Sequence, residues 1–299
     1  MKNILRWVGI IVGSLLGLVV VIAGALFFIG SSRLNKTYNV PADNIAIPTD
    51  AASIERGKHL TETLCTHCHT IDLSGKLWFS FPPAGKVDSA NLTSGEGGIG
   101  QEFTTDEDYV RAIRHGVGPD GKPIFMPSVA AFQGISDEDL GALIAYLKTV
   151  PPVDHKTNGQ QFTPLAKILI GAGVIKLPAA IVSHSPSVTA PEKAVSAEYG
   201  KYLVTISGCQ DCHAQNLSGG PYPQPGVSLI VPNITPGGEV GSWTEEQFIA
   251  TIRTGINPSG HPLDAELMPW PQIRLSSDDE LKAIWMYVQT VPAMEQSSK

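Results

Sequence analysis

The sequence predicts an all-α chain in which one N-terminal transmembrane helix precedes two tandem helical domains. Three observations lead to this prediction. A run of 24 residues without a charge, Trp7 to Gly30, lies near the N-terminus. The rest of the chain is a tandem repeat. Each copy holds three segments with the capping residues and apolar spacing that are typical of helices.

The uncharged run is predicted to be a retained membrane anchor, within residues 1–34. About 20 apolar residues suffice to cross the hydrocarbon core of a bilayer as a helix. The alternative is a cleaved signal peptide, whose apolar region is only ~7–15 residues long. Ala23-Gly24-Ala25 imitates a cleavage site, but the apolar run continues beyond it through Leu26–Ile29. The length of the run therefore favours an anchor.

One face of this anchor carries Gly9, Gly13 and Gly17 at four-residue spacing. Small residues at this spacing let a second membrane helix approach closely, so we expect a contact with another subunit. The alternative is that glycine is simply frequent in membrane helices. Residues 35–49 are predicted to be a linker.

The repeat sets the domain boundaries. Glu55–Leu60 matches Glu198–Leu203, and Leu143–Pro151 matches Ile284–Pro292. The predicted parts are a first domain at 50–151, a connector at 152–194, a second domain at 195–293 and a tail at 294–299.

Three helices are expected in each domain. The first runs near 52–66 and 195–209, the second opens at Thr105 or Thr244, and the third opens at Ser136 or Ser277. A threonine or serine cap followed by acidic residues is typical of a helix start. We therefore interpret the acidic clusters as capping residues; the alternative is that they form patches for a partner.

The connector contains an apolar stretch, Leu165–Val182, that Lys167, Lys176 and Pro178 interrupt. It is too short and too charged for a second span. We expect it to pack over one or both domains, and the alternative is that it lies on the membrane surface.

The chemistry of the chain is concentrated in a repeated pentapeptide. Cys65-Thr66-His67-Cys68-His69 recurs as Cys209-Gln210-Asp211-Cys212-His213, and these hold all four cysteines of the chain. Cys-x-x-Cys-His is the spacing of a c-type haem attachment site. The two thiols add to the haem vinyl groups, and the histidine ligates the iron. The motifs predict two covalently bound haem c groups, with His69 and His213 as proximal ligands.

Other chemistries use a Cys-x-x-Cys pair as well. Two pairs could form one Cys₄ zinc site, and each pair could be a thioredoxin-like dithiol. Neither alternative requires a histidine directly after the second cysteine in both copies.

A sixth iron ligand is expected from methionine. Of the five methionines, only Met126 and Met268 occupy equivalent places in the two repeats, each before a proline. A lone methionine is more often core filler. Matched methionines are better explained as distal ligands, and an iron with six ligands favours electron transfer over catalysis.

Two further matched pairs are candidates for contacts with the haem. Arg114 and Arg253 suit haem propionates, and the alternative is a surface position on a helix. Asn91 and Asn233 stand in Asn-x-Thr triplets that resemble glycosylation sites. Their equal placement instead suggests a polar contact near the haem edge.

The formal net charge is −7. It argues against a nucleic-acid partner, which calls for a basic face. It is compatible with a basic redox partner.

These residues together resemble the class I cytochrome c family, over nearly all of both repeats. Asn91–Thr93, Phe103–Tyr109 and Arg114–Gly121 are similar to segments in the cytochrome c subunits of membrane-bound bacterial alcohol, aldehyde and gluconate dehydrogenases. The resemblance implies quinone- or cytochrome-linked electron relay at the outer face of the membrane. Those subunits typically carry three haem domains, whereas this chain has two motifs.

The predicted function is a membrane-anchored di-haem cytochrome c that transfers single electrons between redox proteins and is itself not an enzyme. Because covalent haem attachment in bacteria takes place outside the cytoplasmic membrane, the haem domains of this single-pass protein should face the periplasm or cell exterior. The protein would be a subunit of a larger respiratory, photosynthetic or dehydrogenase complex. The rivals are a di-haem peroxidase, which needs a haem with an open coordination site, and a haem-based sensor, for which the chain lacks an appended output domain.

Overall fold

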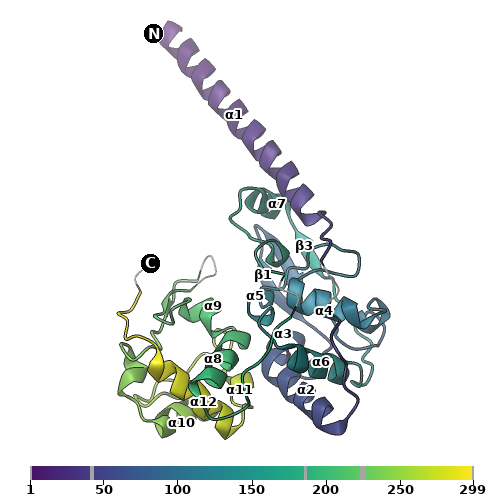
Figure 1. Ribbon diagram of the computed structural model, residues 1–299. Helices are drawn as coiled ribbons and strands as arrows, with labels where there is room; N and C mark the ends of the chain where they lie inside the picture. Colours follow the sequence, from purple (N-terminus) through teal and green to yellow (C-terminus); the bar gives the residue numbers. More distant parts are fainter. Residues whose placement is uncertain (1, 41–43, 185–186, 223–226, 298–299) are drawn as a thin grey trace.

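The computed structural model describes residues 2–40, 44–184, 187–222 and 227–297. The predicted linker and tail therefore lie partly outside the described residues. Helices are the main regular structure, and α1 (Lys2–Leu34) projects from the body as one long rod (Figure 1). Among the described residues, one helix is long and apolar enough to cross a membrane, over Asn3–Leu34. Large apolar side chains along α1 are exposed.

Each half of the body is organised around a pair of long helices. In the first half α2 (Ala51–Leu64) packs against α6 (Asp137–Leu147), and in the second α8 (Ala197–Ile206) packs against α12 (Asp278–Thr290). Matched glycines make both crossings close. A Cβ added to Gly57 would lie 1.9 Å from Ala142 O, and one added to Gly200 would lie 1.9 Å from Ala283 O.

The remaining helices are short. α4 (Asp106–His115) and α10 (Glu245–Thr254) are the middle helices of the two halves. Still shorter are α3 (Thr66–His69), α5 (Val129–Phe132), α9 (Cys209–His213) and α11 (Trp270–Ile273), with 3₁₀ turns η1 (Ile99–Gln101), η2 (Pro178–Ala180) and η3 (Glu239–Ser242).

The helix starts are where the sequence predicts them. In α10, Thr244 Oγ1 accepts a hydrogen bond from Gln247 N at 3.2 Å, and Gln247 Oε1 accepts one from Thr244 N at 2.9 Å. Ser277 and Glu280 make the same reciprocal pair at the start of α12. These bonds satisfy N–H groups that would otherwise have no partner within the helix, which confirms the capping interpretation.

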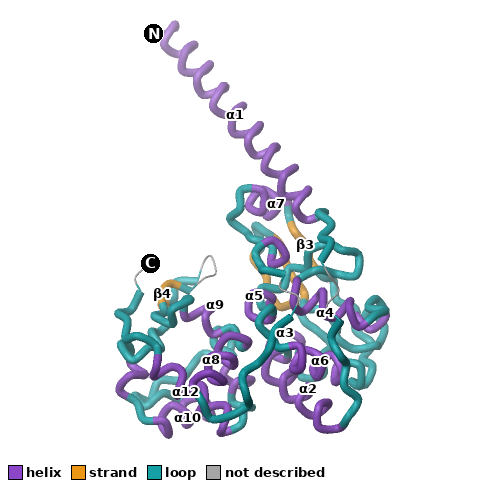
Figure 2. Tube along the Cα trace, in the orientation of Figure 1, coloured by secondary structure: helices purple, strands orange, loops and turns teal. Residues whose placement is uncertain are grey.

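The expectation of an all-α body needs a correction, because short strands are present (Figure 2). Strands β1 (Leu77–Phe81), β2 (Gly85–Asp88) and β3 (Gln160–Phe162) form an antiparallel sheet in that order. Strands β4 (Gly220–Pro221) and β5 (Ile230–Val231) form a second, smaller pair. The aromatic run of β1 favours extended backbone. The sequence did not predict that β1 pairs with β2, or that β2 pairs with β3 from the connector.

The connector also contributes α7 (Pro164–Gly171), which begins with Thr163 as its cap and packs along the C-terminal end of α1. The apolar stretch thus packs on the first half, as expected, and also on α1, which the sequence did not predict.

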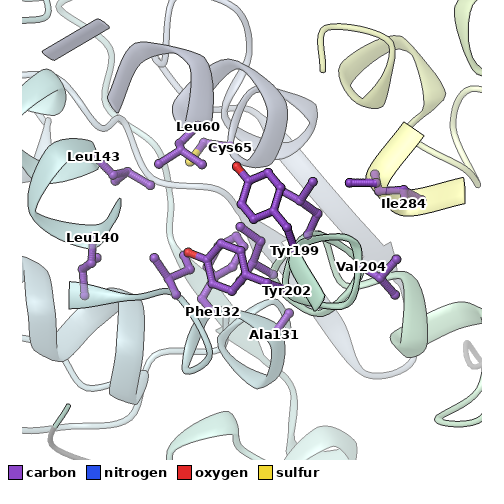
Figure 3. Packing of buried hydrophobic residues seen from close by; sticks show 14 of the residues in the cluster. Leu60, Cys65, Ala131, Phe132, Leu140, Leu143, Tyr199, Tyr202, Val204 and Ile284 are labelled. Carbon is purple, nitrogen blue, oxygen red and sulfur yellow. The ribbon is translucent and has the colours of Figure 1, made fainter. Parts of the chain in front are cut away.

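The two halves meet through a shared apolar cluster (Figure 3). Tyr199 and Tyr202 on α8 are buried next to first-half residues such as Leu60 and Phe132. The hydroxyl group of Tyr202 also donates a hydrogen bond to Asp139 Oδ2 in the first half, at 2.8 Å. The halves are therefore joined by both apolar packing and polar bonds.

Candidate haem attachment sites

Both pentapeptides lie on a short helix that follows the first long helix of each half. Leu64 ends α2, and α3 carries Cys68 and His69; in the second half, α9 spans Cys209–His213. The four cysteines form no disulfide with one another. One helical turn between two thiols suits attachment to two vinyl groups on the same haem edge.

Burial governs the chemistry of these thiols. It raises the pKa of Cys65 and of Cys209 to about 12, and that of Cys68 to about 11. A reactive dithiol needs a lowered thiol pKa, because the thiolate is the nucleophile. The environment of the cysteines therefore counts against the dithiol alternative.

The histidine that ends each pentapeptide is held in one tautomer by a backbone carbonyl. The Nδ1 atom of His69 lies 2.7 Å from Ala90 O, and that of His213 lies 2.8 Å from Pro232 O. Because a carbonyl oxygen can only accept, Nδ1 carries the proton in both rings, and Nε2 holds the lone pair that binds a metal. Burial lowers the pKa of both histidines, against the opposing effect of these bonds, which favours the neutral form that ligates iron.

The backbone after each histidine turns in the same unusual way. Thr70 has φ 68° and Ala214 has φ 65°, a backbone region that residues other than glycine rarely adopt. The turn is closed by Gly75 N, which donates to His69 O at 3.0 Å, and by Gly219 N, which donates to His213 O at 2.9 Å. Backbone strain of this kind persists where the surrounding structure enforces it, often at functional sites.

The two matched methionines occupy equivalent places in the structure as well. Met126 lies between α4 and α5, and Met268 lies between α10 and α11. Both are partly buried and pack against the apolar core that contains Cys65. Thiols one turn apart, a neutral imidazole and a thioether form a donor set that fits covalent haem c.

The matched arginines reach the start of the third helix in each half. Arg114 is fully buried, and its Nη2 donates to Ile135 O and to Asp137 Oδ1, both at 2.8 Å. Arg253 Nη2 donates to Asp278 Oδ1 at 2.6 Å, and its Nη1 donates to Arg274 O. These bonds tie α4 to α6 and α10 to α12, and a propionate contact stays a prediction for both.

The matched asparagines hold the segment that follows the third helix. Asn91 Nδ2 donates to Val153 O at 2.7 Å, and its Oδ1 accepts from Thr93 N at 3.0 Å. In the second half Asn233 Nδ2 donates to Met294 O, also at 2.7 Å. We call residues 152–155 and 293–296 the straps. The sequence did not indicate this role, because both acceptors are backbone carbonyls, 62 and 61 residues further along the chain. A contact of Asn91 or Asn233 with the haem edge stays a prediction.

Within the described ranges, no three histidine, cysteine, aspartate or glutamate side chains gather as they would around a metal ion.

Comparison with known proteins identifies the first half. Residues 54–151 match the family described as cytochrome c. The chain is 30% identical to the fructose dehydrogenase cytochrome subunit of Gluconobacter japonicus, over 84% of this chain and 56% of that protein. It is 27% identical to the alcohol dehydrogenase (quinone) cytochrome c subunit of Gluconobacter oxydans, over 82% of this chain and 56% of that protein. A diheme cytochrome c-type protein of Cereibacter sphaeroides is 28% identical over 66% of this chain and 69% of its own length. The chain thus spans little more than half the length of the first two relatives.

Proposed function

Residues 54–151 form a cytochrome c domain, and from this premise we propose that the whole chain is a membrane-anchored di-haem cytochrome c. It would carry single electrons between redox proteins on the periplasmic side of a bacterial cytoplasmic membrane. The observation that carries the proposal is the matched histidine geometry, since His69 and His213 each bond through Nδ1 to a backbone carbonyl.

A second haem domain is proposed at 195–293, beside the first at 50–151. Its support is the repetition of detail between the halves: the close glycine crossing, the turn after the histidine and the asparagine that holds the strap. Packing of one helix pair could coincide by chance. Agreement at three separate positions favours two copies of one domain.

At each haem, two cysteines, one histidine and one methionine would have distinct roles. Cys65 and Cys68 would attach one haem, and Cys209 and Cys212 the other. When bound, the haem supplies one-electron redox chemistry. His69 and His213 would ligate the iron from one side, and Met126 and Met268 from the other. Thioether ligation favours a higher reduction potential than a second histidine would give.

Anchoring by α1 is proposed from its length and composition, with the haem domains outside. Helices near an N-terminus can also be signal sequences, and the 24-residue uncharged run supports a span instead. The glycine face of α1 is open, because a Cβ added to Gly9, Gly13 or Gly17 would meet nothing within 4 Å. This supports the proposed contact with a membrane helix of a partner.

A place in a dehydrogenase complex is proposed from the relatives. Three of them are named as cytochrome subunits of fructose, alcohol and gluconate dehydrogenases. A catalytic subunit would then deliver electrons to this chain, and the chain itself would not be the enzyme. The rival function, a di-haem peroxidase, requires an iron with an open coordination site, which the paired methionines oppose.

The decisive experiment combines haem counting with a ligand substitution. Intact-mass measurement of the purified protein should show two covalently attached haems. Met268→His should lower the potential of one haem by a substantial fraction of the roughly 0.8 V that axial ligands span, while the other haem keeps its potential. An unchanged pair of potentials would refute the ligand assignment, and high-spin iron that reacts with peroxide would favour the peroxidase.

A further inference from the structure

The outer end of α1 is covered by a helix from the connector. A Cβ added to Gly30 would lie 1.8 Å from Lys167 O, and one added to Gly171 would lie 2.0 Å from Leu26 O. The absence of side chains at Gly30 and Gly171 therefore lets the two backbones touch. Arg33 Nη1 also donates to Ile170 O at 2.6 Å, and the Lys167 ammonium lies 5.3 Å from the centre of the Phe27 ring. Figure 1 shows α7 beside the base of the projecting helix.

This contact fixes the depth of α7 relative to a membrane. The uncharged run ends at Gly30, and α7 packs on Leu26–Gly30 within that run. About 20 residues fill the hydrocarbon core, so the last few residues of this 24-residue run reach the boundary with the headgroups. If α1 spans the bilayer, α7 has to lie at that boundary.

The surface that α7 presents there is apolar. Leu165 is exposed at the start of α7, and Val174, in the turn that follows it, is 66% exposed. Ile181, further along the connector, is also exposed. Water is a poor solvent for such side chains, whereas the interfacial region of a bilayer accommodates them.

Two segments at this end of the first half carry only basic charged residues. Arg33, Lys36, Lys167 and Lys176 fall in segments 31–40 and 160–182, and neither segment contains an aspartate or a glutamate. The full chain nevertheless has a formal charge of −7. Basic residues beside apolar ones at a membrane boundary match anionic phospholipid headgroups.

We propose that residues 164–176, here called the shelf, lie in the outer interface of the bilayer and bind anionic phospholipids. The shelf gives the first half a second attachment to the membrane, next to α1. Because α7 is locked to α1 through Gly30 and Gly171, the two attachments hold the body in one orientation. This inference rests on the proposed anchoring by α1.

The test uses the full-length protein with its haems in liposomes that contain an anionic photoactivatable phospholipid. Mass spectrometry then locates the lipid adducts. We expect adducts on α1 and on the shelf, and at least fivefold fewer on the peptide that contains Ile256, a 50% exposed apolar residue of the second half. When all anionic lipids, including the photoactivatable one, are replaced by zwitterionic counterparts, the number of shelf adducts should fall. The number of adducts on α1 should not change.

A matched pair of variants sharpens the test. Val174→Asp should reduce shelf adducts severalfold with α1 adducts unchanged, whereas Ile256→Asp should change neither. Adducts on α1 with none on the shelf above the Ile256 peptide would overturn the shelf proposal alone. A lack of adducts on α1 would overturn the anchoring on which it rests. In native membranes, cross-links from the shelf to a protein subunit in place of lipid would assign this surface to that subunit and also overturn the proposal.

Discussion

Arg56 and Glu280 form an ion pair between the two halves of the chain, with Nη1 2.8 Å from Oε1. The same guanidinium donates through Nε and Nη2 to both carboxylate oxygens of Asp139, at 2.9 and 3.0 Å. One side chain of α2 therefore bonds to the starts of α6 and α12. His59 adds a contact from its Nε2 to the second oxygen of Glu280, at 2.8 Å.

Replacing this arginine should strongly destabilise the protein. The side chain of Asp139 is 0% exposed and that of Glu280 is 10% exposed. Arg56→Met would leave these buried carboxylates without their main counter-charge, and loss of one partner from a buried pair costs about 3–5 kcal/mol. Chemical unfolding of the detergent-solubilised protein measures the loss.

The matched control is Lys58→Met, two residues along the same helix. Lys58 is exposed, and its Nζ lies 3.8 Å from the exposed carboxylate of Glu55. Such a pair contributes less than about 1 kcal/mol. Equal effects of the two substitutions would show that the network between the halves adds no stability.

The network should also make stability depend on pH. Burial raises the pKa of Glu280, but the bonds from His59, Ser277 and Arg56 outweigh it and hold the pKa at about 2, below the ordinary 4.5. The stabilising contribution is therefore complete above pH 4.5 and is lost as the pH falls toward 2. It amounts to about 3 kcal/mol at neutral pH.

Thermal unfolding of the wild type and of Glu280→Gln between pH 7 and pH 2 measures this contribution. The stability difference between the two proteins should be largest at pH 5–7 and should shrink as the pH falls from 4.5 to 2. A difference that stays constant over this range would contradict the lowered pKa.

The acidic residues at helix starts show which contacts could be predicted from the sequence and which could not. Thr and Ser caps with acids behind them indicated where α4, α6, α10 and α12 begin, because capping depends on residues close in sequence. The second partners of the same acids are distant in sequence. Asp137 meets Arg114, and Glu280 meets Arg56 from the other half. No local pattern encodes such contacts, since they depend on how the halves pack.

The candidate site divides in the same way. The haem ligands stay predictions, which rest on a spacing that carries the chemistry and on methionines that match once the repeat is aligned. The carbonyl partners of His69 and His213 could not be predicted, because Ala90 and Pro232 contribute backbone atoms that any residue has. The small sheets were missed because strands of two to five residues are too short to show an alternating pattern, and because β3 comes from the connector.

Substituting the glycines at the two helix crossings should reduce stability in both halves. In Gly57→Ala the new methyl group would lie 1.9 Å from Ala142 O, and in Gly200→Ala 1.9 Å from Ala283 O. Because neighbouring backbone has to move, each substitution should cost about 1–3 kcal/mol. Gly9→Ala is the control, since nothing lies within 4 Å of its Cβ position. Chemical unfolding gives the values, and loss in only one half would argue against equivalent crossings.

Substitution of Asn91 or Asn233, which bond to the straps, distinguishes a structural role of these residues from a contact with the haem. Asn91 is fully buried, and its amide bonds to Val153 O, His155 O and Thr93. Asn91→Ala removes these bonds and leaves the buried Thr93 N–H without its acceptor, at about 1–3 kcal/mol for a group left unsatisfied. We expect faster hydrogen exchange at residues 152–155 and a lower unfolding midpoint, with the haem potential nearly unchanged.

Two further variants complete the comparison. Asn233→Ala should free the second strap in the same way, because Asn233 Nδ2 donates to Met294 O. Asn158→Ala is the control, since Asn158 is exposed and donates to Asp88 at the surface. If the main role of Asn91 is to hold the strap, Asn91→Ala should speed hydrogen exchange at residues 152–155 and lower the unfolding midpoint. The reduction potential of the haem should stay unchanged. A shifted haem potential with normal exchange at the strap would instead support a contact between this asparagine and the haem edge.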